Sequence, residues 1–302
     1  MRPDKKQLDN FRAFHKSDTE FAAIARLKQS IWRDRKGFKN PKDKLGNYLD
    51  PDFAKTTKSN FLTDRIKALV QYEVYLSHQN NKLISEPRIW ENLLSSQPLA
   101  FNLFGELHFD LKLATKFFKK RYPDSVEEVT KVHFEHSPSR GNLEYTGDHS
   151  AFDVFIEFLS KDKQKGFIGI EVKYVENMSD SKESCERIFK DHGTRYIELS
   201  RKFKIFRDGA FDHLKNSPLQ QVWRDHLLAI STLRDYDQGF FVFLYPKDNN
   251  DCERVVADYC QYLIPDSTKC QFIPETLETY IKVLSKCSKA DWINEFTTRY
   301  LD

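Results

Sequence analysis

The sequence has few of the residues that cross-link a fold or break it up. It contains five cysteines, spread singly between Cys185 and Cys287 with no CxxC pair, which argues against a zinc or dithiol site. Glycine and proline number only 10 and 11 in 302 residues. Such a composition excludes a disordered or fibrous chain and predicts one large or two modest globular domains.

Neither sign of charge dominates, and no long apolar run occurs. Lysine and arginine number 48 against 45 acidic residues, so a nucleic-acid binder would have to group its basic residues locally. No window approaches the ~20 apolar residues of a membrane span, and no apolar leader opens the chain. We therefore expect a cytoplasmic protein without membrane contact, while its oligomeric state stays open.

Several common catalytic motifs are also missing. The sequence contains no Walker A loop, no dinucleotide-binding glycine fingerprint and no G-x-S-x-G elbow. These absences argue against an NTPase, a dehydrogenase and an α/β-hydrolase.

Two hydrophobic periods follow each other along the chain. Helical spacing dominates up to residue 121, including one long helix from Pro98 to Arg121. A period of two then predicts strands over residues 126–136, 151–159, 166–175, 239–246 and 269–274. Helices are expected between and after the later strands, over residues 218–233, 253–263 and 275–301. The order predicts an α/β fold with a mixed sheet, preceded by a helical region.

Strand alternation places ionisable residues together on two successive strands. Phe152, Val154, Ile156 and Phe158 are expected on one face, with Asp153 on the other. On the next strand, Glu171 and Lys173 share the less hydrophobic face. If the two strands form a hairpin, Asp153, Glu171 and Lys173 converge at one end of the sheet.

A carboxylate pair beside an ammonium suggests metal-assisted phosphodiester chemistry. Mg²⁺ or Mn²⁺ would relieve the repulsion between Asp153 and Glu171, because such ions take one or two carboxylates and leave other positions to water and phosphate. Lys173 would then orient or deprotonate the attacking water, or neutralise charge in the transition state. The structural alternative is a cross-strand salt bridge on a solvated face.

These residues resemble a known superfamily. The run TGDHSAFDVFIEF followed by GFIGIEVKY is similar to the hairpin signature of the PD-(D/E)XK nucleases, with Phe152 in place of the usual proline. The stretches ISEPRIWENLLSSQPLAFNLFG and PLQQVWRDHLLA resemble an uncharacterised bacterial restriction-endonuclease-like group. The resemblance covers about residues 23–246. It implies a restriction-endonuclease-like α/β/α core over residues 96–302, with a helical region at 1–95 packed on it.

The resemblance also implies further site residues. Glu106, four residues after Asn102, resembles the helix carboxylate of the superfamily and would be a further metal ligand, while Glu135 on the first strand competes for that role. The polar face of the helix after the ExK strand would contact the scissile phosphate. Its candidates are Gln220, Gln221 and Arg224.

Arg26 and Arg33 lie on one face of an early helix. They would contact the nucleic-acid backbone or lie on a solvated helix surface, and the spacing alone does not separate these hypotheses. The expected function is a metal-dependent nuclease acting on DNA. The alternatives are a non-catalytic nucleic-acid-binding or assembly protein of the same fold and a metal-dependent enzyme acting on a small nucleotide.

Overall fold

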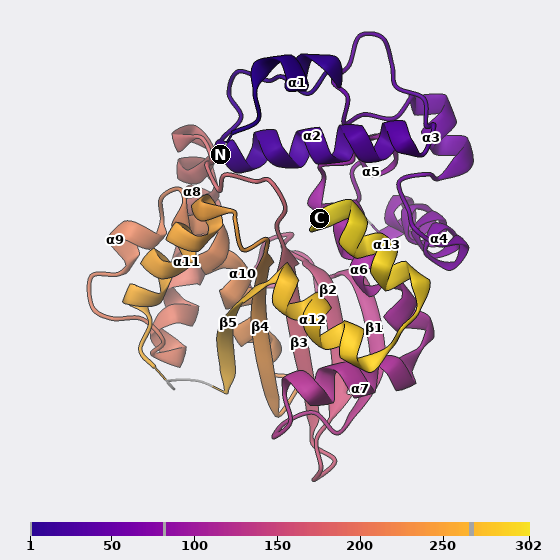
Figure 1. The fold of residues 1–302 in the computed structure, drawn as a ribbon. Coiled ribbons are helices and arrows are strands. Elements are labelled where there is room, and N and C mark those ends of the chain that lie inside the picture. The colour runs from indigo at the N-terminus through magenta and orange to yellow at the C-terminus, as the bar shows by residue number, and fades with distance from the viewer. Residues whose placement is uncertain (1, 81–82, 266–268) are drawn as a thin grey trace. The chain divides into compact units, whose positions relative to one another are not determined.

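The computed structural model describes residues 2–80, 83–265 and 269–302 (Figure 1). The chain divides into two compact units. The helical unit contains the residues up to Asp110 together with Leu277–Asp302, and the sheet unit contains Leu111–Thr276. Residues 96–110 and 277–302 thus group with the N-terminal helices, whereas the sequence-based boundary separates them from residues 1–95.

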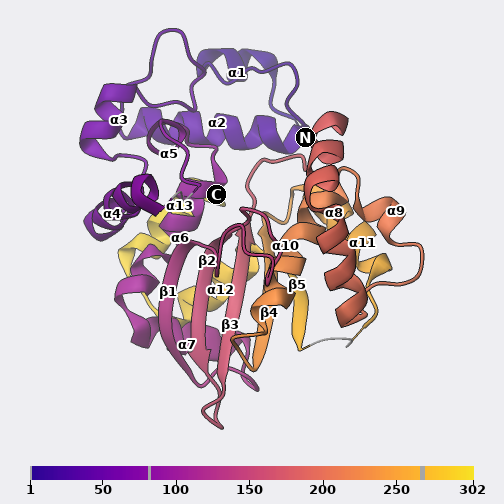
Figure 2. The same ribbon diagram turned by 180° about the vertical axis from the view of Figure 1, so that it is seen from behind.

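The helical unit is built from amphipathic helices with defined caps. Its helices are α1 (Lys5–Asn10), α2 (Glu20–Arg35), α3 (Pro51–Thr57), α4 (Asp64–Asn80), α5 (Arg88–Glu91), α6 (Ser96–Phe109), α12 (Leu277–Cys287) and α13 (Asp291–Tyr300). Helix α2 begins where the Thr19 hydroxyl accepts a hydrogen bond from the backbone N–H of Ala22. Helix α13, from the C-terminal end of the chain, packs against α2 (Figures 1 and 2).

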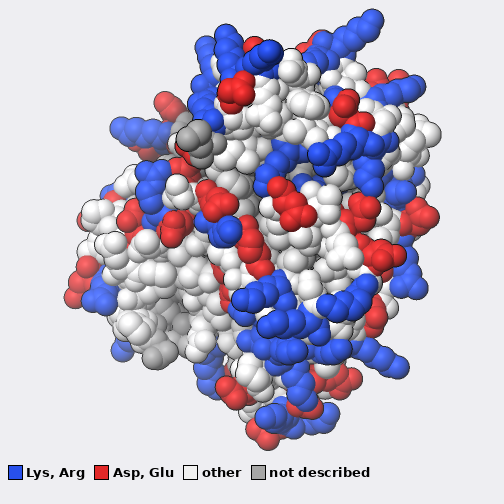
Figure 3. All heavy atoms as spheres, viewed as in Figure 1, with Lys and Arg blue, Asp and Glu red and all other residues white. Residues whose placement is uncertain are grey.

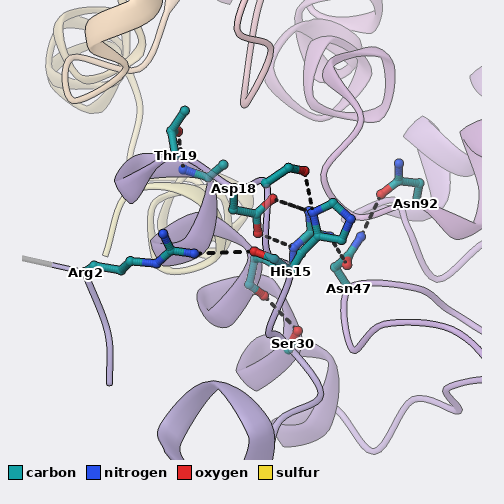
Figure 4. Close-up of polar contacts among 10 residues, drawn as sticks. Arg2, His15, Asp18, Thr19, Ser30, Asn47 and Asn92 are labelled. Carbon is teal, nitrogen blue, oxygen red and sulfur yellow. Dashed lines mark hydrogen bonds and ion pairs between the residues drawn. The ribbon is translucent and has the colours of Figure 1, made fainter. Parts of the chain in front are cut away.

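Polar side chains fix the segment that leads into α2 (Figure 4). The carboxylate of Asp18 lies 3.5 Å from Nδ1 of His15. Asn47 donates a 3.0 Å hydrogen bond to Oδ1 of Asn92, which ties two loops together. These contacts satisfy loop polar groups that burial would otherwise leave without partners.

The long helix expected from Pro98 to Arg121 is instead two helices. Helix α6 ends at Phe109, Asp110 leaves the helical region with φ −119° and ψ 80°, and α7 covers Leu111–Arg121. The prediction was wrong because α6 buries its apolar residues in the helical unit and α7 buries its own in the sheet unit. A single continuous helix would present one apolar face to one core. Helical spacing also extends over residues 87–94, of which only Arg88–Glu91 are helical.

The sheet unit contains a five-stranded mixed sheet. Its strands are β1 (Glu128–His136), β2 (Phe152–Leu159), β3 (Lys165–Val172), β4 (Gln238–Tyr245) and β5 (Cys270–Thr276). They lie in the order β1-β2-β3-β4-β5, with the first two pairings antiparallel and the last two parallel. The helices of this unit are α7, α8 (Lys182–Phe203), α9 (Phe211–Leu214), α10 (Leu219–Thr232) and α11 (Asn250–Tyr262).

Helices cover both faces of this sheet (Figures 1 and 2). On one face, α8, α10 and α11 bury a core that includes Phe155, Phe241 and Trp223. On the other face, Tyr122 at the end of α7 stacks on Phe240 with ring centroids 4.9 Å apart. The expected α/β/α core with a mixed sheet and a helical N-terminal region is confirmed. Among the described helices, none is both long and apolar enough to cross a membrane.

Phe152 lies on a different face from the one expected. Its ring packs 5.4 Å from that of Phe155, on the side of α8 and α10, rather than beside Val154. Gly169 of β3 makes the room, since a Cβ there would lie 2.5 Å from the Phe152 ring. The hydrophobic pattern of β2 does not predict this orientation of Phe152, because the space for the ring is left by a glycine on the neighbouring strand.

Candidate active site

Three carboxylates lie in one row across neighbouring strands. Phe134 pairs with Val154 and His136 with Phe152, which puts Glu135 of β1 opposite Asp153. The register between β2 and β3 puts Asp153 beside Glu171. We call Glu135, Asp153 and Glu171 the carboxylate row.

The backbone of Glu135 is unusual for a strand residue. Its φ of 47° lies in the left-handed region, which non-glycine residues seldom adopt. Its side chain is nevertheless buried, with 6% of the residue exposed. Strained backbone of this kind concentrates at functional sites, where the surrounding structure holds it in place.

Burial and mutual repulsion act on the central acid of the row. Desolvation raises the pKa of Asp153 well above its usual value, and the charges of Glu171 and Glu135 raise it further. Lys173 and the backbone N–H of Val172 oppose the shift, and that N–H donates a 2.7 Å hydrogen bond to Oδ2 of Asp153. The row by itself therefore disfavours a second negative charge, which a bound cation would favour.

Lys173 brings a cation to the row directly after β3. Its ammonium donates a 2.8 Å hydrogen bond to Oε1 of Glu171, and only 6% of the residue is exposed. Burial by itself would lower the pKa of Lys173, but the nearby charges of Glu171, Glu176 and Asp153 outweigh burial and raise it. The predicted convergence of Asp153, Glu171 and Lys173 is thus present in the structure.

Helix α10 contributes a second layer of polar groups. The Nε2 group of Gln221 donates a 3.1 Å hydrogen bond to the same Oε1 of Glu171. Arg224 lies one turn further on, and its Nε is 3.4 Å from Oδ1 of Asp225. Burial opposes the charge of Arg224, yet Asp225, Tyr196, Asp148 and Glu171 together raise its pKa. Arg224 is therefore a cation set among carboxylates.

Asp225 is a site residue that the sequence analysis missed. It is 4% exposed, and its Oδ2 has no hydrogen-bond partner among the described residues. Burial and the charge of Glu171 raise the pKa of Asp225 to about 7. Its position four residues after Gln221 was a usable signal, because residues at i and i+4 share a helix face.

Asp148 was also missed. It lies in the loop between β1 and β2 and accepts hydrogen bonds from Thr146, from the backbone N–H of Ser150 and from the Tyr196 hydroxyl of α8. Burial would raise the pKa of Asp148, but these hydrogen bonds outweigh burial and lower it. Asp148 thus docks the β1–β2 loop onto α8 next to Arg224.

Gln220 does not border the site as expected. It is 1% exposed, and its amide donates hydrogen bonds of 2.9 Å and 2.8 Å to the backbone oxygens of Cys185 and Lys215. Its side chain therefore points toward α8 and toward the segment between α9 and α10, away from the carboxylate row. Gln220 is a packing residue, and Gln221 alone of the glutamine pair reaches the row.

The structure places Glu106 in the helical unit. Its Oε1 accepts a hydrogen bond from Thr63, and its Oε2 lies 3.7 Å from Arg65. Asn102, expected to act with it, is fully buried and bonds to Asn60 and Tyr300. Neither side chain belongs to the unit that contains the carboxylate row.

Arg26 and Arg33 are not surface residues. Arg26 donates two hydrogen bonds to Asp18, at 2.7 Å and 2.8 Å, and a third to Asn47. Arg33 is 7% exposed, and burial lowers its pKa. Both hypotheses assumed an exposed helix face, and that assumption was wrong because this face of α2 packs inside the helical unit.

The donor chemistry of the row suits a divalent cation of the Mg²⁺ type. Oδ1 of Asp153 and Oε2 of Glu171 have no hydrogen bond or ion pair with any described residue. Over residues 2–80, 83–265 and 269–302, no group of three His, Cys, Asp or Glu side chains could hold a metal ion. Mg²⁺ often takes only one or two carboxylates and completes its shell with water, so Asp153 and Glu171 fit such an ion.

Comparison with protein families identifies a match. A model of the PD-(D/E)XK nuclease superfamily matches residues 16–302, nearly the whole chain. The chain belongs to the PD-(D/E)XK nuclease superfamily. No curated protein and no solved structure matches the sequence. Membership supports a nuclease-type phosphodiesterase with a nucleic-acid substrate, and divalent metals are typical of such nucleases.

Proposed function

We propose that this chain is a metal-dependent deoxyribonuclease whose active site is the carboxylate row with Lys173. One observation carries the proposal: Asp153 and Glu171 are adjacent, each keeps one open oxygen, and Lys173 lies 2.8 Å from Glu171. A superfamily member with an intact D…ExK set on paired strands has the groups that hydrolysis needs. A cytoplasmic location stays a prediction of the sequence.

Each residue has a distinct role in this proposal. Asp153 and Glu171 would hold Mg²⁺ or Mn²⁺, which when bound supplies Lewis-acid activation of water and of the phosphate oxygens. Lys173 orients the attacking water and places a positive charge where negative charge develops in the transition state. Gln221 fixes the rotamer of Glu171 through its 3.1 Å hydrogen bond.

Arg224 is the proposed phosphate-positioning residue. Its terminal guanidinium nitrogens make no hydrogen bond with any described residue, and its side chain is 24% exposed. Asp225 and Asp148 lie close enough to raise its pKa and keep it charged. A guanidinium held in this way suits a phosphodiester oxygen pair.

Glu135 is the better candidate for the third acid. It lies opposite Asp153 in the sheet unit, whereas Glu106 already accepts from Thr63 and pairs with Arg65 in the helical unit. We propose that Glu135 orients the water from the first strand.

The central test is a substrate panel with one lysine variant. Linear, nicked, branched and single-stranded DNA, and RNA, are incubated with Mg²⁺, Mn²⁺ or EDTA, using wild type, Lys173→Ala and the exposed control Lys161→Ala. We expect Lys173→Ala to lower DNA cleavage by on the order of 10²-fold or more, at about 1.4 kcal/mol per decade, because the ammonium acts mainly in the transition state. DNA binding in EDTA should change little.

Other results would point elsewhere. Metal-independent cleavage, or near wild-type rates for Lys173→Ala, would remove the row from the mechanism. DNA binding without any cleavage would favour a binding protein of the same fold, and hydrolysis of mononucleotides alone would favour a small-nucleotide enzyme.

A second pair of variants separates the two candidate third acids. Glu135→Gln keeps the size of the side chain and removes its charge, so we expect cleavage to fall by about 100-fold or more, the lower end of the range for a positioned acid–base group. Glu106→Gln should leave the rate within a factor of two or three. Equal losses in both variants, with unchanged melting temperatures, would assign Glu106 a role as well.

A further inference from the structure

A second polar pocket lies in the sheet unit, lined by none of the residues of the carboxylate row. Its volume is about 540 Å³, within the usual range for small-molecule sites. Helix α8 supplies Arg195, Lys202 and Phe203, the turn after α10 supplies Arg234, and the β1–β2 loop supplies Glu144. All of these residues belong to the sheet unit.

Cations outnumber carboxylates among the residues that line the pocket. Its lining contains three cations and one carboxylate. The ammonium of Lys202 has no ion pair or hydrogen bond with any described residue, and it lies 5.3 Å from the centroid of the Phe203 ring. The ammonium of Lys202 is therefore available to pair with a bound anion.

The two arginines are held in place by the loop. Arg195 donates from Nε to the backbone oxygen of Tyr145 at 2.9 Å and from Nη2 to that of Glu144 at 3.2 Å. Arg234 lies 2.6 Å from the Glu144 carboxylate and 3.7 Å from that of Asp235. Arg195 also lies 3.5 Å from the Glu198 carboxylate, so Lys202 is the lining cation without an ion pair among the described residues. Both guanidinium groups are thus oriented before any ligand arrives, which lowers the entropy lost on binding.

Apolar side chains complete the lining. Leu199 is buried at 1% exposure, and Leu233 and Phe203 contribute further apolar surface. An aromatic ring beside cations is the combination that binds a nucleobase and its phosphate, since bases stack on rings and phosphates pair with lysine or arginine.

We propose that this pocket binds a nucleoside monophosphate, with its phosphate on Lys202 and Arg234 and its base against Phe203. The nucleotide is either one unit of a bound strand or a free molecule. The proposal goes beyond the nuclease assignment and does not depend on it. It is tested by binding in EDTA, so that its failure and the failure of cleavage are separate results.

The first measurement is calorimetric titration of the whole protein with three probes. Adenosine 5′-monophosphate should bind at least about 10-fold more tightly than inorganic phosphate or adenosine, because only the nucleotide uses both kinds of lining. If it binds no more tightly than both fragments, the proposal is overturned.

Single-residue variants then locate the site. Lys202→Gln should weaken nucleotide binding by about 10-fold or more, the usual effect of losing a charge-assisted hydrogen bond. The matched control is Lys190→Gln, an exposed lysine of the same helix outside the pocket. Equal affinities of the two variants would overturn the assignment.

A third variant predicts a change of opposite sign. Glu144→Gln removes the nearer of the two carboxylates that compete for Arg234, so nucleotide binding should tighten several-fold. The Glu144 side chain is 63% exposed, so we expect the fold to tolerate the change. Weaker binding by this variant would contradict the proposed position of the phosphate.

Competition identifies the source of the nucleotide. In EDTA, adenosine 5′-monophosphate should displace a fluorescent single-stranded oligonucleotide if the pocket holds one unit of the strand. Simultaneous binding of both would assign the pocket to a free nucleotide. Both outcomes support the pocket, while loss of the response to Lys202→Gln in either format counts against it.

Discussion

Buried charge is treated in opposite ways in the two units. In the helical unit, the guanidinium of Arg299 donates to Gln29 Oε1 at 3.1 Å and to Asn60 O and Oδ1 at 2.7 Å and 2.6 Å. Its centre also lies 4.2 Å from the Trp32 ring centroid. In the sheet unit, Asp153 and Glu171 repel each other, and each keeps an open oxygen.

This difference separates structural charges from functional ones. A buried charge whose hydrogen bonds are met by its own chain stabilises one packing arrangement. Like charges held together with open oxygens raise the energy of the empty protein and are relieved only by a ligand. Two arginines differ in the same way. The Arg26 guanidinium donates hydrogen bonds to Asp18 and Asn47, whereas the terminal nitrogens of Arg224 make no hydrogen bond with any described residue.

The largest expected effect is on the structural side. Arg299→Met removes the guanidinium donors to Gln29 Oε1 and to both oxygens of Asn60, of which Asn60 O keeps the hydrogen bond from the Asn102 amide. We therefore expect the free energy of unfolding to fall by about 3–5 kcal/mol. Urea unfolding at neutral pH measures the loss. The exposed control Arg35→Met in the same unit should change stability by less than about 0.5 kcal/mol. Similar losses in both variants would show that the guanidinium contacts of Arg299 contribute little.

The buried histidine His226 lies outside the carboxylate row, and its titration tests whether burial there affects only the stability of the fold. His226 of α10 is 2% exposed, its Nδ1 lies 2.9 Å from the Tyr259 hydroxyl, and burial lowers its pKa to about 4. The folded state therefore favours the neutral ring, and stability is lost as the pH falls from about 6.5 toward 4, by up to about 3 kcal/mol.

The variant His226→Gln should remove that part of the acid destabilisation. We expect its stability to depend less on pH between pH 6.5 and 4 than that of wild type, measured by urea unfolding at each pH. The control His149→Gln, at an exposed loop position, should keep the wild-type slope. An unchanged slope for His226→Gln would show that the ring is already charged in the folded protein.

The candidate site was predicted from the sequence where the signal was local. Asp153 and Glu171 lie on two strands joined by a short turn, and Lys173 directly follows the second strand. Alternation and hairpin pairing were therefore enough to bring the three residues together. Gln221 was found because helical spacing separates it from the apolar face of α10. All of these positions depend on one strand or helix and its immediate neighbour.

The predictions failed where distant segments decide the outcome. The spacing of Arg26 is compatible with an exposed helix face, but in the structure Arg26 donates hydrogen bonds to Asp18 and Asn47. Phe152 lies on the opposite face from the one expected because Gly169 leaves room for its ring on the next strand. Asp148 enters the site only because a loop folds back onto Tyr196 of α8. Such contacts depend on the register and on loop paths that hydrophobic periodicity does not encode.

The lysines of α7 are exposed, unlike the buried charges compared above. Lys119 and Lys120 end this helix, where cations complement the helix dipole, and Lys119 lies 2.7 Å from Glu127. Lysine and arginine side chains gather on the face around α7 (Figure 3). Exposed pairs of this kind contribute little to stability, and they differ from Lys173 in being solvated.

The smallest expected effect sharpens the comparison most directly, because it needs no substrate. Asp153→Asn keeps an oxygen to accept the Val172 N–H and removes one repelling charge, so in EDTA its melting temperature should equal or exceed that of wild type. Wild type should gain roughly 1.4 kcal/mol at a Mn²⁺ concentration about ten times Kd, a shift of about 1–4 °C. Asp153→Asn should lose most of this shift, and the exposed control Asp162→Asn should keep it. A purely structural salt bridge predicts the reverse, with Asp153→Asn melting lower in EDTA and an unchanged response to Mn²⁺; calorimetric scans of the three proteins therefore decide whether the row is a metal site or a packing feature like Arg299.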